Sequence, residues 1–204
     1  MKNIIYFILF FTCANLFSQK LLIPMDLAQT DHLKAYGIAF LILKQNVPVD
    51  WLLNYRGGSF MTDYSDRFAT ECRLKGVFFE TIDGATAANI YSEVQSETVN
   101  MDVVKLEKPP KIAVYVQPGA QPWDDAVRLA LNYAEIEYDM IWDEEVLGGK
   151  LDKYDWLHLH HEDFTGQYGK FWAQYQTAPW YVEQVALNES MAKKLGYRKV
   201  SEMK

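Results

Sequence analysis

The chain has 204 residues, of which 50% are hydrophobic and 23% are charged, a balance typical of a globular protein with one large domain or two small ones. Its formal net charge is -7 and it contains no basic run, which argues against binding to nucleic acid through charge. Aromatic residues make up 15% of the chain, so a real core or a concave surface is needed to cover them.

The first 18 residues have the pattern of a secretory signal peptide. Lys2 gives a positive start, an apolar run follows from Ile4 to Phe11, and small and polar residues come next. The run is too short for a comfortable membrane span. We therefore expect cleavage after Ser18, export to the periplasm or the cell exterior, and no integral membrane span after cleavage. A lipoprotein anchored through Cys13 is the alternative.

Cleavage would leave Cys72 as the single cysteine of the mature chain, which excludes an internal disulfide. This residue lies in the sequence ATECRLKG, which we predict to be helical. One interpretation is a catalytic nucleophile. The other is a buried core thiol, because cysteine is among the most buried residue types.

Strands are predicted to alternate with helices in a first block, residues 19–106. Short apolar runs indicate strands, whereas apolar residues at helical spacing after a capping residue such as Asp31, or before a stop such as Gly76, indicate helices. The expected order is strand 20–26, helix 30–46, strand 47–55, helix 63–76, strand 77–83, helix 85–97 and a further strand at 101–107.

A second block, residues 107–204, begins with the sequence EKPPK, whose two prolines favour an extended connector. The elements expected after it are strand 111–119, helix 121–137, strand 138–143, a short helix or loop, strand 154–161, and two helical stretches split by Pro179. Alternating strands and helices predict βαβ units. We therefore expect an α/β fold with a parallel, Rossmann- or flavodoxin-like sheet built from two βαβ blocks.

Polar residues follow the predicted strands, where open α/β sheets bind ligands. Asp26 follows the first strand, and Arg56, Gly57, Gly58 and Ser59 follow the second. In the second block, QPGAQPWDD follows the first strand and HHEDFTGQYG follows the last. Backbone N–H groups of such a glycine loop, beside an arginine, can bind a carboxylate or a phosphate. The alternative is a tight strand-to-helix turn that needs positive φ at one of the glycines. No nucleotide-binding motif is present, so we expect a small polar ligand here and no cofactor.

The stretch YDWLHLHHEDFTGQYGKF holds three of the four histidines of the chain. On a strand, His158 and His160 point one way and His161 points the other. Three interpretations stay open: a metal held by the H-x-H pair with Glu162 or Asp163, an acid/base site, and structural histidines next to a capping aspartate. We predict no metal, take His161, Glu162 and Asp163 as catalytic candidates, and take His158 and His160 as ligand-binding candidates.

Several long blocks of the sequence resemble a family of exported bacterial proteins that is often labelled asparagine synthetase B. These blocks are HLKAYGIAF, DWLLNYRGGSF, MDVVKLEKPPKIAVY, QPWDDAV, YAEIEYD and YDWLHLHHEDFTGQYGKF. The label implies a glutamine-hydrolysing enzyme with an N-terminal cysteine and a Ser-Gly-Gly-x-Asp-Ser loop for ATP. In this chain, position 2 is Lys2 and the expected mature terminus is Gln19, so neither position has the cysteine. The ATP loop is absent from the sequence, because RGGSFMTD does not match its pattern.

Residues 111–161 also resemble the opening of a class I glutamine amidotransferase-like domain, which ends its third strand in a Gly-rich ligand loop. Here HHEDFTG stands in that place. The exported family continues into a Gly-rich segment with a cysteine, whereas this chain stops at Lys204. The resemblance thus implies an amidotransferase-like second block that is incomplete at its C-terminus, in a fragment or a short paralogue.

Three functions remain as expectations, and the sequence specifies neither catalysis nor an oligomeric state. The first is an exported α/β protein that binds or processes a small polar ligand at the strand ends. The second is a non-catalytic envelope protein that binds a partner or a carbohydrate through the aromatic segment FWAQYQTAPWY. It loses its basis if Trp172, Trp180 and Tyr181 are buried, because these rings would then close the core. The third is the asparagine synthetase B-type activity that the family label implies.

Overall fold

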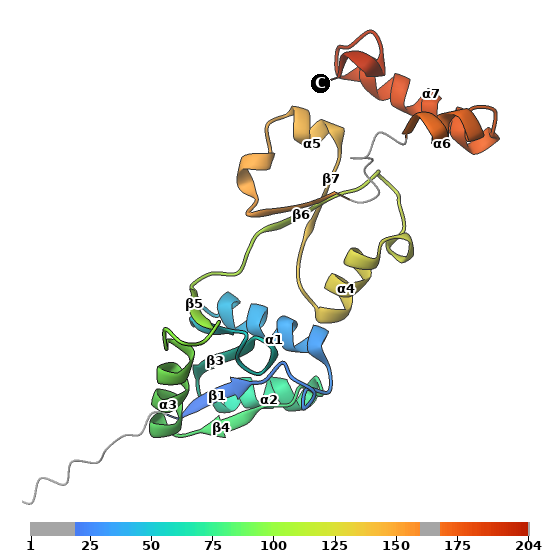
Figure 1. The fold of residues 1–204 in the computed structure, drawn as a ribbon. Coiled ribbons are helices and arrows are strands. Elements are labelled where there is room, and N and C mark those ends of the chain that lie inside the picture. Colours follow the sequence, from blue (N-terminus) through green and yellow to red (C-terminus); the bar gives the residue numbers. More distant parts are fainter. Residues whose placement is uncertain (1–18, 160–167, 204) are drawn as a thin grey trace, which may run out of the picture. The chain divides into compact units, whose positions relative to one another are not determined.

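The computed structural model of the protein describes residues 19–159 and 168–203 (Figure 1). These residues form two compact units. The first unit contains the described residues up to Pro109 together with Ala130–Ile136, and the second contains Pro110–Leu129 and the residues from Glu137 onward. The predicted signal peptide lies outside the described residues.

The first unit is built on a five-stranded sheet in which every neighbouring pair of strands is antiparallel. The strand order is β4-β1-β3-β2-β5. The strands are β1 (Lys20–Ile23), β2 (Val49–Leu53), β3 (Ser59–Asp63), β4 (Glu80–Ile82) and β5 (Asp102–Leu106). The predicted parallel βαβ sheet is therefore wrong for this block, and β3 was missed because residues 60–62 were assigned to no element between the glycine turn and the helix.

Helices cover both faces of this sheet, and the alternation of side chains along β1 shows how. Leu21 and Ile23 pack into a core cluster with α1 (His32–Lys44) and α2 (Asp66–Leu74), whereas Leu22 packs on the other face with α3 (Gly84–Val94). Successive strand residues point to opposite faces, so a continuous apolar run is required where both faces are covered. Asp31 begins α1 by accepting a hydrogen bond from the backbone N–H of Lys34, as the sequence predicted.

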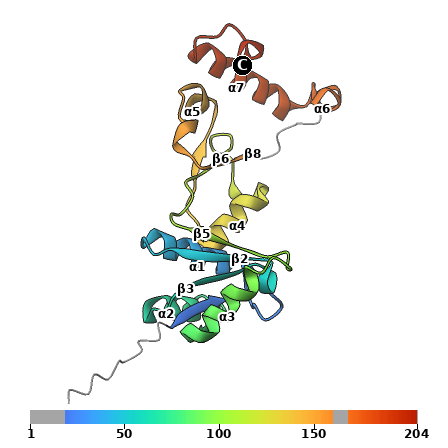
Figure 2. The ribbon, with the colours of Figure 1, turned by 60° about the vertical axis from the view of Figure 1, so that its left-hand side comes forward.

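The second unit has a three-stranded parallel sheet in the order β7-β6-β8, which confirms the parallel arrangement predicted for the second block. Figures 1 and 2 label its elements. They are β6 (Ile112–Tyr115), β7 (Asp139–Ile141), α5 (Asp143–Leu147), β8 (Trp156–Leu159), α6 (Tyr168–Tyr175) and α7 (Pro179–Lys194). Helix α4 (Ala126–Ala134) begins in this unit, and its residues from Ala130 onward belong to the first unit. Within the described ranges, no helix has the length and apolar character needed to cross a membrane.

Cys72 lies in the core cluster of the first unit with no exposed surface. Burial raises the pKa of its thiol to about 12, because the thiolate would lose its hydration. These properties agree with the core-thiol interpretation and leave no reactive thiolate at neutral pH.

We predict that a Cys13→Ser variant will react with a thiol reagent at pH 8 only when it is unfolded. Labelling of Cys72 by iodoacetamide in native buffer should be at least about a hundredfold slower than in denaturant. Mass spectrometry of timed samples measures both rates. Equal rates in the two buffers would contradict the buried position of this thiol.

Position 57 needs a glycine, because two backbone segments approach each other closely there. It has φ of +83°, and a Cβ placed there would lie 2.3 Å from the carbonyl oxygen of Met25. Gly76 has a similar φ of +70°, but a Cβ there would meet nothing within 4 Å. Alanine substitutions at Gly57 and Gly76 therefore separate the cost of backbone strain from the cost of a steric clash.

We predict that Gly57→Ala lowers the free energy of unfolding by at least about 3 kcal/mol, whereas Gly76→Ala costs only the left-handed backbone term of about 1–2 kcal/mol. Urea titrations of the two variants measure this difference. Equal losses would show that the contact with Met25 does not constrain the turn.

Candidate functional site

The structure brings Asp26 and Arg56, which sequence analysis proposed as ligand-binding residues, into direct contact. The Arg56 guanidinium donates from Nε to Asp26 Oδ2 at 2.7 Å and from Nη1 to Glu80 Oε1 at 2.8 Å. The hydrogen bond from Arg56 is the main cause that lowers the pKa of Asp26, and the two carboxylates raise the pKa of Arg56. One cation therefore faces two anions, a charge balance that disfavours an anionic ligand.

The glycine loop turns the chain between the antiparallel strands β2 and β3, not from a strand into a helix. Gly57 and Gly58 both have positive φ, as the tight-turn alternative required. The backbone N–H of Gly58 donates to Tyr55 O at 3.0 Å, and the buried Ser59 hydroxyl donates to the same oxygen at 2.9 Å. Arg56 O accepts from Met25 N at 3.1 Å. These groups hold the turn together and do not form an open anion nest.

We predict that Arg56→Gln flattens the acid dependence of stability. A carboxylate whose folded-state pKa is lowered stabilises the fold above its unfolded-state pKa of about 3.9, and that contribution is lost as the pH falls through the folded-state value. Without Arg56, the pKa of Asp26 should lie closer to its unfolded-state value, so the part of the acid-induced loss of stability that comes from Asp26 should disappear. Urea titrations between pH 7 and pH 2.5 measure it.

Lys105→Gln is the matched control, because Lys105 lies 3.9 Å from Glu107 in an exposed pair. This control should keep the acid dependence of the parent protein. The interpretation fails if both variants keep that dependence unchanged.

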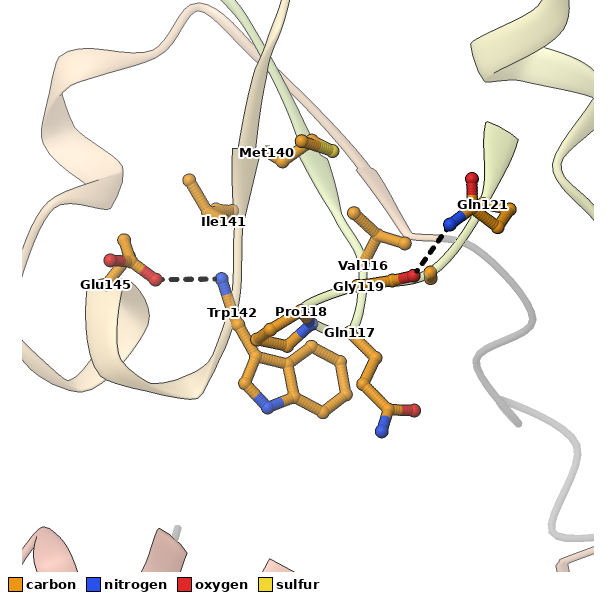
Figure 3. Close-up of a pocket in the computed structure, with 10 residues that line it drawn as sticks. Val116, Gln117, Pro118, Gly119, Gln121, Met140, Ile141, Trp142 and Glu145 are labelled. Atoms are coloured by element: carbon orange, nitrogen blue, oxygen red, sulfur yellow. Dashed lines mark hydrogen bonds between the residues drawn. The ribbon is translucent and has the colours of Figure 1, made fainter. Parts of the chain in front are cut away.

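A pocket of about 350 Å³ lies in the second unit, at the carboxyl ends of β6 and β7 (Figure 3). This is the position where open parallel sheets bind ligands, and the volume lies in the range of small-molecule sites. It is lined by Val116, Gln117, Pro118, Gly119, Ala120, Gln121, Met140, Ile141, Trp142 and Glu145. The pocket is the strongest candidate site in the described part of the chain.

Trp142 and Glu145 form one side of this pocket, where β7 passes into α5. The Trp142 ring stacks on Tyr115, with ring centroids 4.6 Å apart, and the Tyr115 hydroxyl bonds to Asp143. Glu145 Oε2 accepts from the backbone N–H of Trp142 at 3.1 Å, the main cause that lowers the pKa of Glu145, and Oε1 accepts from Lys150 Nζ at 3.3 Å. Both residues are thus held in place by contacts within the protein.

The loop after β6 forms the other side and carries two glutamine side chains. Gln117 Nε2 donates to Gln184 Oε1 at 2.7 Å, and Gln121 Nε2 lies 3.4 Å from Gly119 O. Figure 3 shows the Gln117 side chain and the Trp142 ring projecting in the same direction. The pocket therefore presents amide groups beside an aromatic ring.

Behind this loop lies a polar cluster of buried Asp125 and Arg128 with partly buried His158. Arg128 is 4% exposed, and its Nη1 donates to Ala120 O at 3.2 Å while Nη2 lies 3.2 Å from Met140 Sδ. Asp125 Oδ1 accepts from the backbone N–H of Arg128 at 3.1 Å and lies 3.7 Å from His158 Nε2. The cluster ties the start of α4 to the pocket loop.

His158 is the one predicted histidine whose position the structure describes, and it is not among the residues that line the pocket. His160, His161, Glu162 and Asp163 lie outside the described residues, so their roles stay predictions. Across residues 19–159 and 168–203, no group of three or more His, Cys, Asp or Glu side chains could hold a metal ion.

The aromatic segment proposed as a binding surface is partly exposed. Trp172 and Trp180 are 50% and 51% exposed, whereas Tyr181 is 6% exposed. Tyr175 packs on Trp180 with ring centroids 5.4 Å apart. The two tryptophans meet the exposure that this hypothesis requires, and Tyr181 does not.

The strand-end rule pointed to the loop QPGAQPWDD, which begins at Gln117, two residues after β6, but none of its residues was taken as a site candidate. Trp142 follows β7 directly, so the same rule could have found it, yet the candidates came from the glycine loop and the histidine cluster. Arg128 gave no sequence signal, because its burial depends on acceptors from two other segments.

The fold and the pocket define a two-unit α/β protein with a candidate small-molecule site in its parallel unit. Neither a known protein family, nor a curated protein, nor a solved structure matches the chain.

We predict that Arg128→Leu lowers the free energy of unfolding by about 1–3 kcal/mol, because acceptors are left unpaired in a buried site. It should also accelerate amide hydrogen exchange in residues 117–121. Arg67→Leu, at an exposed position of α2, should change neither quantity. Wild-type exchange in the loop of the Arg128 variant would contradict its role in holding that loop.

Proposed function

We propose that the second unit of this protein binds a small polar ligand in the pocket at the carboxyl ends of β6 and β7. The observation that carries the proposal is the pocket of about 350 Å³ at that position. The contacts of Trp142 support it further, because its ring stacks on Tyr115 and its backbone N–H donates to Glu145. The N-terminal sequence pattern favours an exported protein, so the ligand would be met outside the cytoplasm.

Binding, rather than cysteine-based hydrolysis, is the activity that the residues support best. The resemblance of the second block to amidotransferase-like domains stays a prediction. A thiol nucleophile would have to come from elsewhere, because residues 107–204 contain no cysteine. Asparagine synthetase B-type activity remains the alternative that the family resemblance implies, and glutamine- and ATP-dependent amidation of aspartate tests it.

Binding through the aromatic segment is a second candidate, supported by the exposure of Trp172 and Trp180. The two candidates place the ligand against different tryptophans. The two candidates can therefore be distinguished by which tryptophan's indole N–H resonance shifts when a ligand binds.

The decisive experiment is a two-dimensional ¹H–¹⁵N spectrum of the indole N–H groups, recorded with a library of small polar compounds. We predict that a binding compound shifts the resonance that disappears in Trp142→Phe, a variant that keeps a ring to stack on Tyr115. The matched variant is Trp180→Phe. Shifts confined to the Trp180 resonance would favour the aromatic segment, and no shift with any compound would overturn the pocket as a binding site.

A further inference from the structure

The charges around the pocket restrict the class of ligand. Among the described residues that line it there is no lysine, arginine or histidine, and the one charged side chain is Glu145. The nearby guanidinium of Arg128 is buried and directed at Ala120 O and Met140 Sδ. A phosphate or carboxylate ligand would lack the charged donors that normally bind it.

A cationic ligand fits little better. Both oxygens of Glu145 accept hydrogen bonds, one of them from the Lys150 ammonium group, which already balances the charge. Recognition of organic ammonium groups uses the faces of aromatic rings. Trp142 is the one aromatic residue in the lining, and it is already stacked on Tyr115.

The remaining groups match a molecule with many hydroxyl groups. Each glutamine amide offers both donors and acceptors, as a hydroxyl group does, and Trp142 Nε1 adds a donor. Gln117 and Gln121 lie on the loop after β6, and Figure 3 shows Trp142 across from that loop. Val116, Ile141 and Met140 add apolar surface, which suits the C–H groups of a sugar ring.

We propose that the ligand of this pocket is a neutral polyhydroxylated molecule of the size of a single sugar ring, such as a monosaccharide or a cyclic polyol. This inference rests on the proposed function, because it names the ligand class of the same pocket. The volume of about 350 Å³ is sufficient for one ring with bridging water.

Saturation-transfer NMR on the full chain tests the class with six probes: D-glucose, D-galactose, myo-inositol, choline, L-glutamine and inorganic phosphate, the last followed by ³¹P line broadening. At least one of the first three should bind. We predict that Gln121→Leu weakens that binding by about 3- to 10-fold, the effect of one neutral hydrogen bond. Gln95→Leu, at an exposed position of α3's C-terminal end, should leave it unchanged.

The outcomes separate the two proposals. Sugar or inositol binding that is weakened about 3- to 10-fold in Gln121→Leu and shifts the Trp142 indole resonance supports the inference. Choline, glutamine or phosphate binding at the Trp142 resonance, without sugar binding, overturns the ligand class and leaves the proposed function standing. Sugar binding that is unaffected by Gln121→Leu and by Trp142→Phe overturns the inference. No binding of any probe, together with no response to the compound library, overturns both.

Discussion

The buried guanidinium of Arg128 is the constraint on which the pocket depends. A charged group that is 4% exposed must find acceptors within the fold, and one of them is the carbonyl of Ala120 in the pocket loop. The same side chain reaches Met140 on β7. The loop after β6 is therefore held toward β7, and these contacts fix the separation of the two sides of the pocket. A neutral side chain of the same length would not require this arrangement.

Asp125 and His158 belong to the same constraint. Asp125 is 1% exposed and caps the first turn of α4 through the backbone N–H groups of Val127 and Arg128. Its carboxylate lies near His158 on β8, so strand, helix and loop meet at one polar cluster. The sequence suggested His158 as a ligand contact. Its position next to a buried carboxylate favours a supporting role for it.

The two sheets show what a single sequence can and cannot predict. Apolar runs located β1, β2 and β6, because burial on both faces requires them. Strand direction is not encoded locally, and the stretch NYRGGSF reads equally well as a strand-to-helix turn or as a hairpin. What decides between them is the pairing of β3 with β1 and β2, a long-range contact. The parallel unit was predictable because the helix α4 between β6 and β7 leaves room for a crossover connection.

Of two loops that sequence analysis singled out at strand ends, only the one after β6 lines the candidate pocket. The hydrogen bonds within each loop explain this difference. In the loop around Arg56, the cation is matched by Asp26 and Glu80, and the Gly58 N–H and the Ser59 hydroxyl both bond to Tyr55 O. In the loop after β6, the cation is beneath the loop, and Gln117 and Gln121 each bond within the protein through Nε2, which leaves their amide oxygens for a ligand. Polar composition marks both loops equally in the sequence. A ligand site needs, in addition, polar groups that the protein has not already used for its own turn.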